Sequence, residues 1–253
     1  MSDVPEIKVK SLKKAIDVLN CFIDKQPIGI TEISEKLGVY KSNVHSILTT
    51  LAALDYVDQD KETGKYYLGI GALRLGHAIG DRYSFKNVAK KHINLIADET
   101  GEQVYFTVPF DGHTYFLDTA YPDSGAPVLL GNIKNPLEML HTTGSGKAMM
   151  AYMSQDYLKE YLSKPLTRTT EYSITDAGKF IKELESIKKQ GYATDRQEAL
   201  IGINCVAVPI LSVGGDVMGA ISISGPSPRF SEEKIAEFAQ ILKNHAKEIQ
   251  KNI

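Results

Sequence analysis

The chain has 253 residues, of which 43% are hydrophobic and 24% are charged, and these are ordinary values for a globular protein of one large domain or two modest ones. A net charge of -2 excludes a uniformly basic nucleic-acid-binding protein, so any DNA-binding surface must be built from locally placed lysines. No apolar run approaches the roughly 18 residues needed to cross a bilayer. The N-terminus also lacks the apolar segment of a signal peptide, so we expect a cytoplasmic protein with no membrane partner. Cys21 and Cys205 fit no metal-ligand spacing, and we expect no disulfide, metal or cofactor.

The first part of the chain is predicted to contain two helices before a tight turn. The first helix has apolar residues at helical spacing, namely Leu12, Ala15, Ile16, Leu19 and Phe22. Thr31 is expected to cap a second, short helix that turns Ile33 and Leu37 inward. Gly38 follows at the position where a helix end needs a left-handed residue, so the chain is expected to turn there.

The next helix, predicted over residues 41–54, has two contrasting faces. Its apolar residues share one side, and they are Val44, Ile47, Leu48, Leu51 and Leu54. The opposite face is polar, and no acidic residue occurs between Lys36 and Leu54. Strands over 56–58 and 66–68 are expected to pair around a turn at 60–64.

Helix, turn, helix and hairpin in this order are typical of a winged helix-turn-helix, whose second helix meets base edges in the major groove. We therefore predict a DNA-binding domain over residues 1–69, with double-stranded DNA as its partner. The candidate DNA-binding residues are Thr31, Lys41, Ser42, Asn43, His45, Ser46 and Thr49, together with Lys61 and Lys65 at the hairpin. Asn43 and His45 suit bases, and Lys41 and Ser42 suit phosphates. The same module also fits a helical unit that binds only protein.

The rest of the chain indicates a separate α+β domain over residues 83–253, with a mainly antiparallel sheet and a connecting helix over 70–82. Helices are predicted over 85–100, 155–162, 180–190 and from 232 to the end, and strands over 103–109, 115–119, 205–211 and 217–224. The first of these helices is expected to bury Val88, His92, Leu95 and Ile96. Ser231 is expected to cap the last helix.

The segment HTTGSGKA, residues 141–148, is not a P-loop, because His141 stands where the motif needs glycine and Ala148 where it needs Ser or Thr. What remains is a glycine-rich turn that enters a helix, where free backbone N–H groups can hold an anion. Further along, Ser222 and Ser224 alternate on one strand and therefore face the same side of the sheet. Their hydroxyls suit a polar ligand.

Nearly the whole chain resembles the IclR family of bacterial transcriptional regulators. The resemblance rests on ITEISEKLGVYKSNVHSILTTL and YV...KYYLG in the first part, and on LHTTGSGKA, GYATDRQEALIGINCVAVPI and GAISISGPSPRF in the second. It implies an N-terminal winged helix-turn-helix, a linker helix and a C-terminal GAF-like domain that binds a small-molecule effector. The expected protein is a ligand-responsive DNA-binding regulator, more commonly a repressor, which acts as a homodimer or homotetramer.

The resemblance also implies an effector site for a small carboxylate or keto acid. Gly144 and Ser145 would contact the ligand through their backbones, and Asp195 and Cys205 would face it, beside Ser222 and Ser224. The chain departs from the family pattern at three positions near this site, which are Arg196, Gln197 and Asn204.

Two other functions fit parts of the sequence. The first is a sensor that binds a ligand and a protein partner but no DNA, which the weak net charge of the first 69 residues favours: they hold nine lysines, no arginine and ten acids. The second is an enzyme with Cys205 as nucleophile and His113 or His141 as base. That reaction needs an accessible thiol of low pKa, whereas Cys205 lies in an apolar run.

Overall fold

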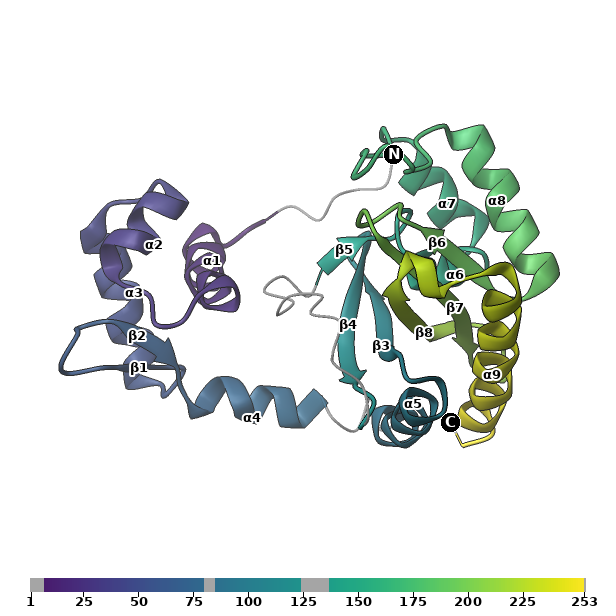
Figure 1. Ribbon diagram of the computed structural model, residues 1–253. Helices are drawn as coiled ribbons and strands as arrows, with labels where there is room; N and C mark the ends of the chain where they lie inside the picture. The colour runs from purple at the N-terminus through teal and green to yellow at the C-terminus, as the bar shows by residue number, and fades with distance from the viewer. Residues whose placement is uncertain (1–6, 80–84, 124–136, 253) are drawn as a thin grey trace. The chain divides into compact units, whose positions relative to one another are not determined.

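The computed structural model describes residues 7–79, 85–123 and 137–252. The chain divides into two compact units, Met1–Tyr83 and Ser84–Ile253, each with its own core (Figure 1). The predicted connecting helix is present as α4 (Ile70–Ile79), and the remainder of its predicted span lies outside the described residues. None of the described helices is long and apolar enough to cross a membrane.

Over residues 7–79, the first unit contains three helices, a short hairpin and α4. Its elements before α4 are α1 (Lys10–Asp24), α2 (Ile30–Leu37), α3 (Lys41–Ala53), β1 (Val57–Gln59) and β2 (Tyr66–Leu68). The hairpin is antiparallel, with Asp58 opposite Tyr67. Ile28 adds a single bridge to Tyr66 and so connects the segment before α2 to the hairpin. These elements form the predicted winged helix-turn-helix.

The core of the first unit corrects the predicted buried face of α1. The side chains that α1 buries are Val18, Cys21 and Phe22, whereas the predicted Leu12 and Ile16 are exposed. Apolar residues cover more than one side of this helix, so spacing alone does not decide which side meets α2 and α3. The structure leaves an apolar stripe on the outside of α1.

The predicted ends of α2 and α3 are also corrected. Thr31 lies inside α2, because the helix begins at Ile30 and Gly29 occupies the cap position, where its N–H donates to Glu32 Oε2 at 2.9 Å. Gly38 ends α2 with a φ of 63°, as predicted. Helix α3 stops at Ala53, and Leu54 is 59% exposed instead of buried.

The second unit is built around one antiparallel sheet with the strand order β5-β4-β3-β8-β7-β6. The strands are β3 (Gln103–Phe110), β4 (His113–Ala120), β5 (Leu137–Met139), β6 (Ala193–Arg196), β7 (Ile203–Leu211) and β8 (Val217–Pro226). The helices are α5 (Phe85–Thr100), α6 (Gly144–Met150), α7 (Gln155–Leu162), α8 (Ala177–Gln190) and α9 (Glu232–Gln250), with a short 3₁₀ turn, η1 (Ser227–Arg229), before α9. The predicted α+β class is therefore confirmed.

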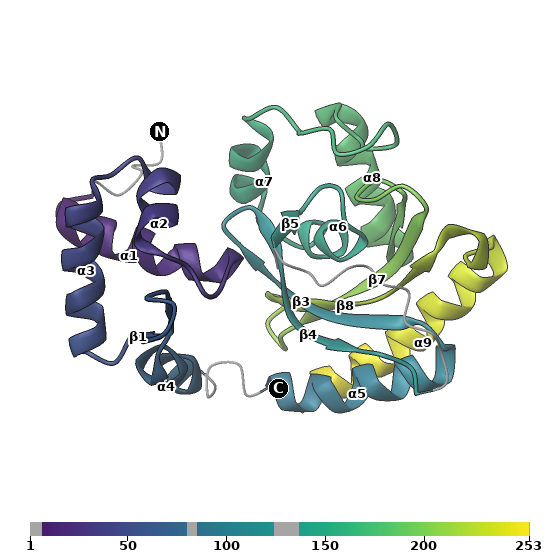
Figure 2. The same cartoon turned by 60° about the vertical axis from the view of Figure 1, so that its left-hand side comes forward.

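Helices cover both faces of this sheet (Figure 2). Helix α5 packs on β3 and β4, and α9 packs on β7 and β8. Helix α6 packs on the opposite face, against β6, β7 and β8, with α8 beyond it. Because side chains alternate along a strand, each strand contributes to two different layers.

Most of the predicted elements of this unit are present, with three corrections. Helix α8 begins at Ala177, where Asp176 caps it by accepting from Lys179 N, three residues before the predicted start. Helix α5 buries Ala89, Ile93, Ile96 and Ala97. Of the predicted residues only Ile96 is fully buried, since Val88 and His92 are partly buried and Leu95 is 48% exposed. Strands β5 and β6 were not predicted, because segments of three or four residues carry too little periodicity. The predicted Ser231 cap of α9 is confirmed by its bond from Lys234 N.

Candidate DNA-binding surface and effector site

The outward face of α3 carries six of the nine predicted DNA-binding residues. Val44, Leu48 and Leu51 point into the core. The helical repeat therefore turns the polar residues out, and all six are exposed: Lys41, Ser42, Asn43, His45, Ser46 and Thr49. The structure brings these side chains together on one surface with no acid among them, as the sequence predicted.

Two of these side chains are less free than their exposure indicates. Ser46 Oγ donates to the carbonyl of Ser42 at 3.0 Å, and Thr49 Oγ1 donates to that of His45 at 2.9 Å. Such bonds to the preceding turn hold the hydroxyl hydrogen along the helix. Ser42, Asn43 and His45 make no such side-chain bond to the residues that the structure describes. These three are the better candidates for base or phosphate contacts.

The remaining three predicted residues lie outside α3. Thr31 is exposed on α2, and Lys61 is exposed in the hairpin turn. Lys65 is half-buried, with its Nζ 3.5 Å from Glu32 Oε2. Because the Glu32 carboxylate partly neutralises the charge of Lys65, Lys61 is the hairpin lysine that can interact more strongly with a phosphate.

Tyr40 was not among the predicted contacts. It caps α3 without a side-chain hydrogen bond and is 82% exposed, the largest value for an aromatic side chain among the described core and surface residues. An aromatic residue placed between a helix-ending glycine and the polar helix was the available signal in the sequence.

The predicted effector residues form a row across the sheet in the second unit. In the strand register, Asp195 of β6 lies opposite Cys205 of β7, and Cys205 lies opposite Ser224 of β8. Gln103 of β3 lies on the far side of Ser224. Asp195, Cys205, Ser224 and Gln103 are all buried. Ser222, two residues before Ser224, hydrogen-bonds the Cys205 thiol.

The first turn of α6 lies directly over this row. A Cβ placed on Gly144 would be 3.0 Å from Cys205 Sγ, so the closeness of the helix to the sheet depends on glycine here. Thr143 Oγ1 caps the helix by accepting from Gly146 N at 3.0 Å. Helix geometry leaves the N–H groups of Gly144 and Ser145 without intrahelical acceptors. The structure thus gathers all six predicted effector residues at one place.

A buried ionic network lies beside the row. Lys147 of α6 is 1% exposed and forms ion pairs with Glu198 and, at 3.1 Å, with Glu183 of α8. Burial disfavours the charge on Lys147, but the two carboxylates outweigh burial and raise its pKa. Sequence reasoning missed this network, because its members come from three distant segments.

Asp195 has the most altered titration at the site. Burial, together with the adjacent Glu198, raises its pKa to about 8, although Lys147 and two backbone N–H groups oppose the shift. Its Oδ1 accepts from the N–H of Glu198 at 2.6 Å. At neutral pH the carboxyl is therefore mainly protonated and can donate a hydrogen bond to an anionic ligand.

The Cys205 thiol lacks the surroundings of a nucleophile. Burial, and next the nearby Asp195, raise its pKa to about 12. Both ring nitrogens of His141 are engaged elsewhere, with Tyr161 Oη at 2.7 Å and the Thr167 carbonyl at 2.8 Å. His113 Nδ1 donates to the carbonyl of Asp111 at 2.7 Å. The structure therefore does not bring either histidine to the thiol as a base.

One unpaired polar atom points to an additional ligand contact. Gln103 Oε1 is buried and has no hydrogen-bond partner among the described residues. Gln103 bonds to the Tyr105 hydroxyl, and because its oxygen is unpaired, its amide N–H is the donor. Buried polar atoms are normally satisfied, so a ligand or water is expected beside Gln103. Sequence reasoning missed this residue because β3 lies far from β8 in the chain.

The three departures from the family pattern have different surroundings. Arg196 turns outward and pairs with Glu232 at the start of α9, at 2.7 Å. Gln197 adopts a φ of 64°, and its Oε1 accepts from Gly202 N. Asn204 is buried. Arg196 therefore does not supply a positive charge to the site. No group of three or more metal-ligating side chains occurs in the described ranges.

A winged helix-turn-helix unit followed by a sheet unit with a buried polar site defines the class of ligand-responsive transcriptional regulators. The comparisons with known proteins agree. The profile for the bacterial transcriptional regulator IclR C-terminal domain matches residues 77–251, and that for the IclR helix-turn-helix domain matches residues 11–61. The chain belongs to the IclR family of DNA-binding transcriptional regulators.

Several members are similar over nearly their whole length. The transcriptional regulator KdgR of Escherichia coli (strain K12) is 30% identical over 245 residues, which cover 95% of this chain and 91% of KdgR. The IclR structure from Thermotoga maritima superposes with a TM-score of 0.74 at 33% identity, covering 96% of this chain and 98% of that one. An IclR homolog from Microbacterium hydrocarbonoxydans, complexed with 4-hydroxybenzoate, has a TM-score of 0.84 at 21% identity, with 95% and 98% covered, and shares the fold.

Proposed function

We propose that α3 enters the major groove of an operator, with Ser42, Asn43 and His45 as its central contacts. The observation that carries this proposal is the exposed, acid-free polar face of α3. Lys41 and Lys61 would bind phosphates, and Thr31, Ser46, Thr49 and Lys65 would lie at the edges of the contact.

Replacing Ser42, Asn43 and His45 together by alanine tests this proposal. A good base contact contributes about 1–3 kcal/mol, so we expect operator affinity to fall at least about tenfold in a gel-shift titration at fixed salt. Asn20→Ala, a substitution of an exposed polar residue on α1, is the matched control and should bind as the wild type does. Unchanged operator affinity of the triple variant would favour a sensor that acts through protein partners.

Tyr40 is proposed as a further phosphate contact, because it is exposed where α3 begins and backbone contacts commonly surround a recognition helix. Tyr40→Phe should weaken binding to operator and unrelated DNA by similar factors. A loss confined to the operator would instead assign Tyr40 to base recognition.

We propose that the second unit binds a small carboxylate or keto acid between α6 and the sheet. The ligand anion would accept from the N–H groups of Gly144 and Ser145 and from protonated Asp195, beside Cys205, Ser222 and Ser224. Gln103, with its unpaired oxygen, would accept from a hydroxyl of the ligand. The 4-hydroxybenzoate bound by the Microbacterium homolog belongs to this chemical class.

A thermal-shift screen tests the proposed ligand class without knowledge of the operator. A ligand that binds only the folded state raises the melting temperature by mass action. We expect stabilisation by at least one of pyruvate, benzoate and 4-hydroxybenzoate, and no stabilisation of a Gly144→Val variant that still folds. Stabilisation only by neutral or cationic compounds would contradict the proposal.

We propose that the regulator acts in the cytoplasm as a homodimer or homotetramer and that it is a repressor. The support within the first unit is an apolar surface that the unit does not cover itself: Leu12, Ile16 and Ile23 of α1 and Ile70 and Leu73 of α4 are exposed. In a dimer, the two winged helix-turn-helix units would bind the two half-sites of one operator. Ile16→Glu should lower the oligomeric state, or the affinity of the pair for DNA, in light scattering and gel shifts.

Binding of effector and operator would be reciprocal. If the effector weakens operator binding by some factor, operator DNA must weaken effector binding by the same factor. A regulatory role also needs no chemical turnover. We propose that Cys205 is a structural thiol, and its alkylation at neutral pH should be slow in the folded chain.

A further inference from the structure

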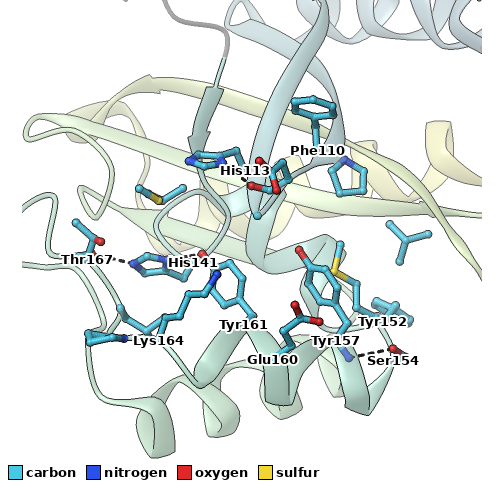
Figure 3. Close-up of a pocket in the computed structure, with 18 of the residues that line it drawn as sticks. Phe110, His113, His141, Tyr152, Ser154, Tyr157, Glu160, Tyr161, Lys164 and Thr167 are labelled. Atoms are coloured by element: carbon cyan, nitrogen blue, oxygen red, sulfur yellow. Dashed lines mark hydrogen bonds between the residues drawn. The ribbon is translucent and has the colours of Figure 1, made fainter. Parts of the chain in front are cut away.

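A cleft in the second unit is separate from the proposed effector site. Its volume is about 750 Å³, which falls in the range of small-molecule sites. It lies between the β3–β4 turn, the segment after α6, helix α7 and the segment that follows α7 (Figure 3). None of the six proposed effector residues lines it.

Aromatic side chains form much of the cleft wall. Tyr157 and Tyr161 stack with their ring centroids 6.3 Å apart and an interplanar angle of 20°. Phe110 and Tyr152 also line the cleft, and Phe110 is 60% exposed. The faces of such rings carry partial negative charge, so they attract an organic cation as well as an apolar body.

The hydrogen bonds at the base of the cleft give it acceptor character. The Thr167 carbonyl can only accept, so His141 Nε2 carries the hydrogen in this bond of 2.8 Å. Burial lowers the pKa of His141, so its ring is neutral and Nδ1 is an acceptor. Tyr161 must therefore donate its hydroxyl hydrogen to Nδ1, at 2.7 Å. The phenolic oxygen of Tyr161 also accepts from the backbone N–H of His141, and its second lone pair suits a ligand that donates.

The charged residues at the rim also favour a ligand that carries a positive charge. Asp111, Glu160 and Asp216 line the cleft and are exposed, and Lys164 is the one Lys or Arg among the lining residues that the structure describes. Figure 3 shows Glu160 on α7 beside Tyr157 and Tyr161. Burial raises the pKa of Tyr157, and the carboxylates of Asp111 and Glu160 raise it further. The described lining therefore carries more acidic than basic side chains, while the Lys188 ammonium lies next to the wall, 5.7 Å from the centroid of the Tyr152 ring.

We propose that this cleft binds a small organic cation with a flat apolar body, such as an arylalkylamine. The apolar body would lie against Tyr157 and Phe110, and the ammonium group would lie between Glu160 and the Tyr161 oxygen. A carboxylate of the same shape would meet three acids and an acceptor oxygen. The cleft and the proposed effector site thus select ligands of opposite charge.

Three probes of similar size test the proposal on the full chain: benzylamine, benzyl alcohol and benzoate. We expect benzylamine to bind more tightly than benzyl alcohol in isothermal titration calorimetry. Glu160→Gln should weaken benzylamine binding by roughly fivefold, the size of an exposed charge interaction. Lys164→Met removes a like charge and should tighten it by roughly twofold to fivefold.

Glu185→Gln is the matched control, because Glu185 is an exposed acid on α8 outside the cleft. It should leave benzylamine binding unchanged, and circular dichroism should show all variants folded. Benzoate that binds at the proposed effector site can be distinguished from benzoate in the cleft, because neither Glu160→Gln nor Lys164→Met should alter its affinity. The proposal is overturned if benzylamine does not bind, if benzyl alcohol binds as tightly, or if Glu160→Gln and Lys164→Met fail to act in opposite directions.

Discussion

The two faces of the six-stranded sheet have the same strands but different chemistry. Toward α5 and α9 the strands present aliphatic and aromatic side chains, namely Val104, Phe106, Val206, Val208, Ile221 and Ile223. Toward α6 the same strands present Gln103, Tyr105, Cys205, Ser222 and Ser224, joined by Asp195. Alternation along each strand therefore separates the layer that stabilises the unit from the layer that can bind a ligand.

The largest expected effect comes from the aliphatic face. Phe106 is completely buried, so Phe106→Ala should lower the free energy of unfolding by about 3–5 kcal/mol through lost burial and a residual cavity. Urea unfolding with a fitted m-value measures this change. A loss below about 1 kcal/mol would mean that the two faces do not differ in their role in stability.

Lys147→Met tests whether the polar face has a stabilising element of its own. The substitution leaves Glu198 buried without its counterion, and breaking a buried pair in this way costs about 3–5 kcal/mol. The double change Lys147→Met with Glu198→Gln removes both charges and should restore most of the loss. Equal destabilisation by the single and double variants in urea unfolding would argue that packing, not charge, explains the effect.

The raised pKa of Asp195 should give the polar face a pH effect of its own. The pKa of Asp195 is raised from an ordinary 3.8 to about 8, so the folded chain keeps a proton that the unfolded chain loses near pH 4. Its contribution to stability therefore declines as pH rises from about 4 to about 8. Asp195→Asn, which keeps an acceptor for Glu198 N, should reduce the fall in melting temperature between about pH 6 and about pH 9. An identical fall in both proteins would refute the raised pKa.

The smallest change in stability is expected for Ser222→Ala. A buried hydrogen bond contributes about 0.5–1.5 kcal/mol, and alanine fills nearly the same space as serine. The free energy of unfolding should therefore change by about 1 kcal/mol or less. The rise in melting temperature that a bound carboxylate causes should be reduced much more than the stability of the ligand-free protein, and a thermal-shift assay measures both. A variant that binds the carboxylate normally would remove Ser222 from the proposed site.

The sequence alone determined the local features, because they depend on residues within a few positions of one another. Gly38 marks the end of α2, the helical repeat of α3 turns Ser42, Asn43 and His45 outward, and the period of two places Ser222 beside Ser224. The winged helix-turn-helix and the family followed from these features and from the motifs. The buried sides of α1 and α5 did not, because their apolar residues allow more than one inward face.

Only the tertiary structure decided which distant residues meet. The β3–β8 pairing places Gln103 opposite Ser224, and the packing of α6 on β7 puts Gly144 over Cys205. Lys147 meets Glu198 across 51 positions of sequence. Strand order and helix packing set these contacts through burial of the whole sheet, and no local repeat encodes them. The sequence therefore named six residues of the candidate effector site, and the fold added their electrostatic surroundings.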